Sequence, residues 1–375
     1  MKKFINQKDM KLTNTADVFD LIRKSGRITR RQIADKTNMS WGAVSTITAQ
    51  LIEDGYILEV KSDEGGVGRT PYYLEVNGDV HFSLGIDVNN TGLRAVLVNL
   101  KNETVESISE SADFSDRDTL MRHICSFTER ALELAAERHV ICIGLAMQGI
   151  VDSKNGISIS LSDCKGWENV PLTYILSERF GLPVFIEHDP NCILYAISAP
   201  LRKDTMLVRI DRGIGMAVML GGKIIDKPGI FELGHTVVDP DGDECLCGRH
   251  GCLEMYASQS GLERRSEMSF ASLTERAKNG DADAKKHFVI MARHLSYAIS
   301  NVAHLLGIKN IILCGDMCDC KELFFEDFIK YNKLYDPKGS LELSFSDVSN
   351  AALGAAMIST RITLKEIEIE NKKEN

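Results

Sequence analysis

Three cysteines and one histidine occur within 18 residues of one another, in the segment GHTVVDPDGDECLCGRHGCLE. They are His235, Cys245, Cys247 and Cys252, with the spacing H-x9-C-x-C-x4-C. Three thiolates and one imidazole are enough to complete a tetrahedral zinc site, and the glycines at 248 and 251 permit the tight turns that such close ligands need. Because four protein ligands leave no open position, the sequence predicts a structural Zn2+ ion and not a catalytic one.

His250 and a second group of cysteines are expected to take no part in metal binding. His250 could compete as a ligand, but its turn is expected to leave it at the surface. A second cluster, Cys314, Cys318 and Cys320, lacks a nearby fourth ligand, and its members are expected to be ordinary thiols. The alternative for the first group is a chance cluster of three buried cysteines and a core histidine. The chain's ten cysteines, in a reducing compartment, argue against a disulphide framework.

Basic side chains concentrate at the N-terminal end of a chain that is acidic as a whole. The 375 residues carry a formal net charge of −9, yet residues 1–50 hold ten Lys or Arg against four Asp. Residues 1–78 come to +2, which leaves −11 for the remainder. The two parts are therefore expected to meet different partners, and a nucleic acid suits only the first.

The basic segment contains the start and stop signals of three short helices. An amphipathic pattern ends near Gly26, and Thr29 with Gln32 forms a capping box for a second helix. Ser40 can cap a third helix, which is expected to stop at Gly55. A tight turn before the third helix makes this a helix-turn-helix. The alternating segments 56–60 and 72–76 then predict a β-hairpin wing with a glycine-rich tip.

The second helix of a helix-turn-helix pair enters the major groove of DNA, and its early residues meet base edges. With Val44, Ile47 and Leu51 turned inward, the opposite face of the third helix is free for DNA. The predicted DNA-binding residues are Arg30, Arg31, Ser40, Trp41, Gly42, Ser45, Thr46 and, at the wing tip, Arg69. The alternative is a small helical docking domain with a solvated basic face.

From about His81 onward, strands and helices alternate, which indicates an α/β fold. FSLGIDV-NNTG-LRAVLVNL and MLVRID-RGIG-MAVMLGG are similar strand-turn-strand units about 120 residues apart, and they suggest two lobes related by duplication. Residues 364–375 are predicted to be a charged tail. No apolar run approaches the ~20 residues of a membrane span, and the N-terminus lacks the apolar region of a secretory signal, so a cytoplasmic protein is expected.

Together these motifs resemble the ROK family, which unites bacterial repressors with sugar kinases, and the resemblance covers essentially the whole chain. Residues 1–78, ending in GGVGRTPYYLEVN, look like the winged helix-turn-helix of the repressor branch. Residues 79–363 look like the family's two-lobed, actin-like, sugar-binding domain, with a zinc loop at 235–252. ELGH followed by CLCGRHGCLE is similar to the family's zinc motif, which implies the four ligands named above. The same stretch supplies sugar contacts in the family, which implies that Glu232, His235 and Glu254 line the interlobe cleft.

The family's kinases need three nucleotide-binding elements, and each is altered here. Asp-x-Gly-Gly-Thr is replaced by DVNNT at 87–91, Gly-Thr-Gly-x-Gly by DRGIG at 211–215, and the glycine run of the adenosine loop by CGD at 314–316. Glycines let the backbone approach phosphates closely, and a carboxylate at the second loop repels them. The resemblance therefore implies no catalytic residue and no enzymatic activity.

The sugar-binding side of the family pattern is better preserved. IEHDPN is similar to the family's Glu-Asn-Asp-Ala-Asn, and it places Asp189 where the kinases hold their general base. Without a phosphate site, Asp189 is expected to bind a ligand hydroxyl. The implied sugar-binding residues are Asp163, His188, Asp189, Glu232, His235 and Glu254. His188 stands for a usual Asn, and Phe231 for a usual Gly. The alternative is that helix N-terminal amides satisfy Asp189 and Glu232, and Trp167 is equally a core residue.

These features predict a sugar-responsive transcriptional regulator, most simply a repressor of a carbohydrate-utilisation operon. Its expected partners are double-stranded operator DNA and a small sugar or sugar derivative. Because two half-sites require a two-fold protein, a homodimer is expected, with a tetramer as the alternative assembly. A sugar kinase fused to a DNA-binding head and a docking protein are the alternative functions.

Overall fold

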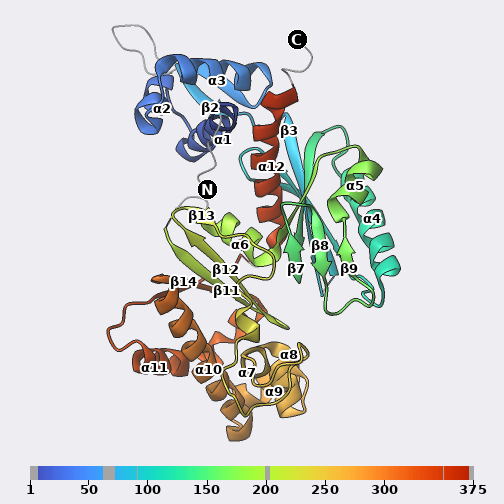
Figure 1. The fold of residues 1–375 in the computed structure, drawn as a ribbon, viewed down its shortest axis with the longest axis vertical. Coiled ribbons are helices and arrows are strands. Elements are labelled where there is room, and N and C mark those ends of the chain that lie inside the picture. The colour runs from blue at the N-terminus through green and yellow to red at the C-terminus, as the bar shows by residue number, and fades with distance from the viewer. Residues whose placement is uncertain (1–6, 62–71, 91, 199–202, 349, 371–375) are drawn as a thin grey trace. The chain divides into compact units, whose positions relative to one another are not determined.

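The computed structural model of the protein describes residues 7–61, 72–90, 92–198, 203–348 and 350–370. The chain divides into two compact units, residues 1–192 together with 352–375, and residues 193–351. The first unit contains a small helical head and a five-stranded sheet, and the second contains another five-stranded sheet with its own helices (Figure 1). The α/β fold class is confirmed.

The head consists of α1 (Gln7–Ser25), α2 (Arg30–Thr37), α3 (Trp41–Glu53) and an antiparallel pair, β1 (Ile57–Lys61) and β2 (Tyr72–Val76). Thr29 caps α2 in a capping box with Gln32, and the Ser40 side chain accepts from the backbone N–H of Ala43 at the start of α3. The predicted helix-turn-helix and its caps are therefore confirmed. The first helix is longer than expected, and the wing tip with Arg69 lies outside the described residues.

The sheet of the first unit has the strand order β10-β6-β3-β4-β5. Its strands are β3 (His81–Asn89), β4 (Gly92–Asn99), β5 (Thr104–Glu110), β6 (His139–Met147) and β10 (Val184–His188), and its helices are α4 (Arg117–Glu133), α5 (Leu172–Phe180) and α12 (Ala351–Glu370). Helix α6 (Asp189–Ser198) begins in the first unit and continues into the second from residue 193. A small antiparallel sheet comprises β7 (Ile150–Asp152), β8 (Ile157–Ser160) and β9 (Glu168–Val170).

The second unit repeats the same sheet topology in the order β15-β14-β11-β12-β13. Its strands are β11 (Thr205–Ile210), β12 (Ile214–Leu220), β13 (Lys223–Ile224), β14 (Asn310–Cys314) and β15 (Glu342–Phe345). In both sheets an antiparallel hairpin is extended on one side by two parallel strands, which supports the expected duplication. The helices are η1 (Leu233–His235), α7 (Glu254–Ala257), α8 (Gln259–Ser266), α9 (Phe270–Lys278), α10 (Ala282–Leu306), η2 (Asp316–Leu323) and α11 (Phe325–Tyr335). None of the described helices is long and apolar enough to cross a bilayer.

The C-terminal helix α12 corrects the prediction of a charged tail. It continues through Glu370, so the tail expected at 364–375 is wrong for residues 364–370, and residues 371–375 lie outside the described part. Leu364 is buried in an apolar cluster that it shares with the head. Further back, α12 lies backbone to backbone on the sheet, because a Cβ at Gly85 or Gly144 would overlap a carbonyl oxygen of this helix.

Candidate functional site

Helix α3 turns one apolar face to the core of the head and an opposite face of polar and small residues to solvent. Val44, Ile47 and Leu51 are buried, as the pattern predicts. The predicted DNA-binding residues on the other face are exposed or half-buried: Ser40, Trp41, Gly42, Ser45 and Thr46. The Trp41 side chain, at the start of this face, is 59% exposed. This face has the composition and exposure of a groove-reading helix.

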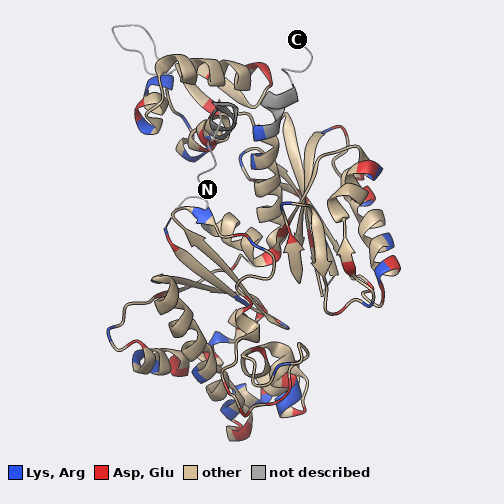
Figure 2. Cartoon of the chain, in the orientation of Figure 1, with Lys and Arg blue, Asp and Glu red and all other residues tan. Residues whose placement is uncertain are grey.

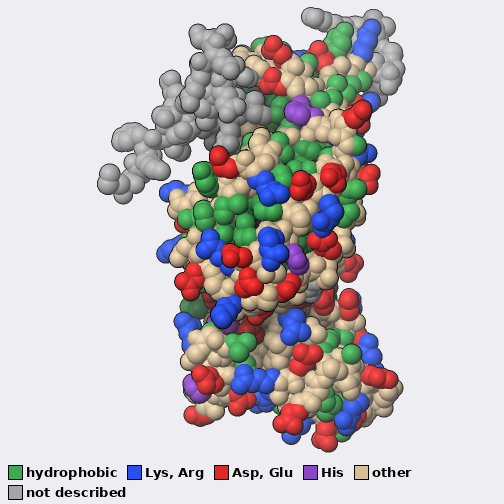
Figure 3. Space-filling model, turned by 90° about the vertical axis from the view of Figure 1, so that its right-hand side faces the viewer, with side chains coloured by type: hydrophobic (Ala, Val, Ile, Leu, Met, Phe, Trp, Pro, Cys, Tyr) green, Lys and Arg blue, Asp and Glu red, His purple; other side chains and the backbone are tan. Residues whose placement is uncertain are grey.

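The basic residues of α2 divide into two roles. Arg30 donates its Nε–H to the buried Thr48 hydroxyl (2.9 Å) and forms an ion pair with Glu59, so it braces α2 against α3 and β1. Arg31 and Lys36 are exposed. Arg31 is therefore the better placed of the two predicted arginines to meet a phosphate. Figure 2 shows the positions of basic and acidic residues along the ribbon of the chain. On the face of the molecule drawn in Figure 3, basic and acidic side chains are interspersed and not separated into patches of one sign.

The four predicted metal ligands converge in the second unit. The ligand atoms of His235, Cys245, Cys247 and Cys252 all lie within 4.8 Å of one another. The sulphurs of Cys247 and Cys252 are 3.6 Å apart, and Cys245 Sγ is 3.7 Å from His235 Nδ1. A tetrahedral ion with Zn–S bonds of about 2.3 Å separates its sulphurs by about 3.8 Å, so the four side chains fit a zinc ion. The described residues contain no second group of this kind.

The remaining thiols and His250 stand apart from this group. His250 is exposed, with its Nδ1 3.3 Å from the Gly242 carbonyl oxygen, as expected of a non-ligand. Cys314 and Cys320 are buried and Cys318 is half-buried. Burial raises the pKa of Cys318 to about 12 and that of Cys320 to about 11, which is typical of inert thiols.

An aromatic residue that the sequence did not single out holds the loop before the cysteines. Tyr256 on α7 donates its hydroxyl to Asp239 Oδ2 (2.8 Å), and the Arg265 guanidinium lies 4.5 Å from the centre of its ring. Gly251, at φ +68°, packs so closely on the Asp239 carbonyl that a Cβ there would overlap it. The loop that carries three thiols is therefore held in shape by the protein itself.

On the sugar-binding side, the first unit supplies three of the predicted residues. Asp189 is buried as the first residue of α6, with its Oδ1 3.5 Å from Nε2 of the half-buried His188. Asp163 is exposed between β8 and β9. Trp167 is fully buried and donates to the Ser158 hydroxyl (2.8 Å), so it is a core residue and not a stacking platform.

The second unit supplies the other three. Glu232 is exposed directly before η1, and His235 belongs to the metal group. Glu254 is half-buried, and its Oε2 accepts from the backbone N–H of Ile214 (3.1 Å). Phe231, at φ +63°, adopts a backbone conformation that favours glycine, in agreement with the resemblance that places a glycine there.

The turn between β11 and β12 is filled by the chain's own carboxylates. Asp211 Oδ1 accepts from the backbone N–H of Asp316 (2.5 Å), and its other oxygen pairs with Arg209. Glu254 takes the amide of Ile214 at the same turn. Burial and the neighbouring Asp211 raise the pKa of Asp316. Amides that could meet a phosphate are thus already occupied by anionic groups.

Comparisons with known proteins agree with this architecture. A winged helix-turn-helix DNA-binding model matches residues 16–57. The DNA-binding transcriptional dual regulator NagC of Escherichia coli K12 is 26% identical over 399 residues, covering 98% of this chain and 97% of that protein. The xylose repressor of Caldicellulosiruptor bescii is 25% identical over 350 residues, covering 84% of this chain and 86% of that protein.

Solved structures show the same fold. A ROK family transcriptional regulator, described as a homologue of the E. coli Mlc protein, superposes with a TM-score of 0.83 at 23% identity, covering 95% of this chain and 97% of that one. A ROK family glucokinase from Streptomyces griseus, in complex with glucose and AMPPNP, has a TM-score of 0.65 at 22% identity and covers 75% of this chain and 99% of that one. The kinase thus lacks a counterpart for part of this chain. Since the ROK family model matches residues 83–361, the chain belongs to the ROK family.

Proposed function

We propose that the protein is a DNA-binding transcriptional regulator, and specifically a sugar-responsive repressor of carbohydrate-utilisation genes. The observation that carries the proposal is the exposed face of α3, where Trp41, Gly42 and Thr46 lie open on a basic head joined to a ROK domain. The relatives are named as repressors and regulators, which supports the same function. Operator DNA, read by the residues predicted above, is the proposed partner.

The proposed effector is a sugar or a sugar derivative. The family resemblance supports Asp189, buried at the start of α6, and Glu232, exposed directly before η1, as candidate effector-binding residues. The relatives include a xylose repressor and N-acetylglucosamine repressors, so a pentose and an amino sugar are the first two ligands to test. Enzymatic activity is not proposed, because the family's nucleotide-binding loops are altered here, and carboxylates of Asp211 and Glu254 already accept from the amides of Asp316 and Ile214 in two of them.

A structural zinc ion is proposed at His235, Cys245, Cys247 and Cys252. The donor set and its spacing support zinc, since thiolate-rich tetrahedral groups favour that ion. Bound there, the ion would link the three cysteines of the loop to His235 at the end of η1, and it would have no catalytic role. We further propose that the protein acts in the cytoplasm as a homodimer or a tetramer, because paired half-sites require paired heads.

The test is binding to DNA from the region upstream of the protein's own gene. Fluorescence anisotropy with a labelled duplex should give tight binding that weakens steeply with salt, because phosphate neutralisation releases counterions. Xylose, N-acetylglucosamine or a related sugar should change the affinity. Failure to bind any upstream duplex would favour the docking protein instead. Turnover of ATP with magnesium on any sugar of the same panel would establish the kinase and contradict the proposal.

A further inference from the structure

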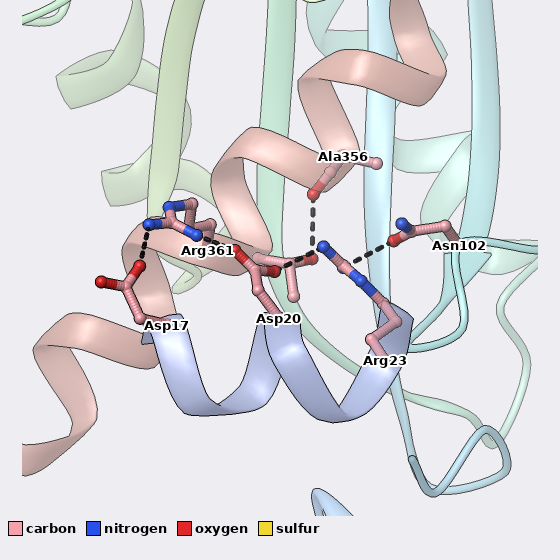
Figure 4. Close-up of polar contacts among 7 residues, drawn as sticks. Asp17, Asp20, Arg23, Asn102, Ala356 and Arg361 are labelled. Carbon is pink, nitrogen blue, oxygen red and sulfur yellow. Dashed lines mark hydrogen bonds and ion pairs between the residues drawn. The ribbon is translucent and has the colours of Figure 1, made fainter. Parts of the chain in front are cut away.

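A polar network joins the DNA-binding head to the C-terminal helix within the first unit. Arg361 on α12 reaches two carboxylates of α1: its Nη2 lies 2.7 Å from Asp17 Oδ1, and its Nη1 pairs with Asp20 Oδ2 (Figure 4). Asp20 Oδ1 also accepts from Arg23 (2.5 Å), and Arg23 donates to Asn102 Oδ1 (2.8 Å) in the turn between β4 and β5. The network thus links α1 of the head to two separate elements, helix α12 and the turn between β4 and β5.

The geometry of this network fixes a rotation as well as a position. Asp17 and Asp20 are three residues apart, so they lie on one face of α1, about one turn from each other. A single guanidinium binds both, one with each terminal nitrogen, and the planar fork sets their common direction. A point charge at the same place would attract both carboxylates without fixing the angle of α1 about its own axis.

Burial distinguishes the two arms of the fork. The Asp20 side chain is 8% exposed and the Arg23 side chain 9%, so these charges are largely removed from water and must stay paired. Asp17 is 37% exposed, and on its own such a pair contributes little to stability. The outer arm therefore serves geometry more than stability.

Attachment of the head does not depend on Arg361. Val18, Phe19 and Ile22 of α1 share one apolar cluster with residues of the sheet and of α12, including Leu100, Ile141, Cys142 and Leu364. Val44 and Ile47 of α3 belong to the same cluster, so α3 turns with α1. The apolar cluster holds the head in place, and the forked ion pair selects the angle at which it is held.

We propose that Arg361 is a positioning residue for operator recognition: its fork on Asp17 and Asp20 sets the orientation of α3, and so the half-site spacing that two copies can bridge. The inference rests on the proposed function, because it concerns a DNA-binding dimer. Half-sites on B-DNA repeat at about 10 base pairs, so a small change in head angle alters which spacing both recognition helices can reach.

The test separates half-site affinity from spacing preference. A half-site is first recovered by in vitro selection from random DNA with the wild-type protein. Affinities are then measured for a single half-site and for palindromes whose spacing is changed in steps of one base pair. Arg361→Lys keeps the charge but not the fork, and Asp17→Ala removes only the outer arm. Both should bind the single half-site within about two-fold of wild type, while the preference for the wild-type spacing falls at least about five-fold.

Two matched variants frame the result. Arg179→Lys alters an exposed ion pair with Glu129 elsewhere in the first unit and should change neither readout. Arg31→Ala should weaken binding to every duplex without changing the spacing preference. An unchanged spacing preference in Arg361→Lys and Asp17→Ala, or equal wild-type affinity for single and paired half-sites, overturns the inference. Failure of the wild type to select any duplex overturns the proposed function itself.

Discussion

At the scale of single residues, the proposed zinc site at His235, Cys245, Cys247 and Cys252 contains one exposed thiol, that of Cys247. Cys247 is exposed, whereas Cys245 and Cys252 are buried, so a serine at 247 leaves the apolar packing of the loop intact. Cys247→Ser is expected to lower bound zinc from about one ion per chain to well below half, because a hydroxyl is a poor replacement for a thiolate ligand. Elemental analysis of the purified protein measures this. Cys318→Ser, in the second cluster, should keep the ion.

The same variant tests whether the loop takes part in the response to the effector. Operator binding of Cys247→Ser should persist, while the change in affinity on adding the sugar should be lost together with the ion. Normal induction in a metal-free variant would contradict a role of the zinc loop in the response.

A pair of histidines at the head makes a second prediction at this scale. His81 Nε2 lies 2.7 Å from the Asp54 carbonyl oxygen and must donate to it, so the neutral ring accepts at Nδ1 from Nδ1–H of His139 (3.0 Å). The Tyr56 ring stacks on His81. Burial lowers the pKa of His81, the hydrogen bond to Asp54 opposes this, and His139 adds to the lowering. Protonation of His81 would put a second N–H at Nδ1, where the neutral ring accepts the hydrogen bond from His139.

The sign of the pH dependence follows from this lowered pKa. Below about pH 6.5 the unfolded chain binds a proton at residue 81 that the folded chain resists, so stability present at neutral pH should be lost as the pH falls towards 5. Chemical denaturation at several pH values measures it. His81→Gln keeps an N–H donor for Asp54 and cannot titrate, so its pH dependence should be flatter. The exposed His304→Gln should behave like wild type. An unchanged slope in His81→Gln would rule out the pair as the cause.

At the scale of elements, the sequence predicts those features that depend on residues close together in the chain, such as helix caps. Thr29 with Gln32 and Ser40 cap their helices as expected, because a cap bonds residues two or three positions away. The convergence of His235 with the three cysteines was also predicted from their spacing, since the cysteines lie within eight residues, and whether they bind a metal stays a prediction. Partners far apart in the sequence left no such trace: Arg361 meets Asp17 across 344 positions, and the brace of Tyr256 on Asp239 has no characteristic spacing.

Helix α12 provides the clearest case and a prediction. KEIEIE reads as a solvated charged end, but Leu364 just before it is 3% exposed in the cluster shared with the head. Leu364→Ala should lower the free energy of unfolding by about 2 to 4 kcal/mol, from lost burial and the cavity left behind. Leu305→Ala, whose side chain is 84% exposed on α10, should change it by less than about 0.5 kcal/mol. Equal, small effects in denaturant titrations would restore the tail interpretation.

At the scale of the whole molecule, one sheet topology is used twice, and among the described residues both copies have loop amides bonded to side chains of the protein itself. In the first unit the backbone N–H of Asn90 donates to Gln148 Oε1 (3.0 Å), and in the second the amides of Ile214 and Asp316 meet carboxylates. Groups at the positions of the family's nucleotide-binding loops thus make internal contacts in this chain. A head with net charge +2 on a body of −11 confines attraction for DNA to one end of the sequence.

This division of roles predicts which ligands stabilise the folded chain. A sugar bound only by the native state raises stability by RT ln(1 + [L]/Kd), about 2.7 kcal/mol at one hundred times Kd, and so raises the Tm by a few degrees. ATP with magnesium should leave the Tm unchanged, because Asp211 and Glu254 already fill the turn. Differential scanning fluorimetry with sugars, phosphosugars and ATP measures both. Asp189→Asn should abolish the sugar-induced shift but not folding, and a shift produced by ATP alone would contradict the assignment of those carboxylates.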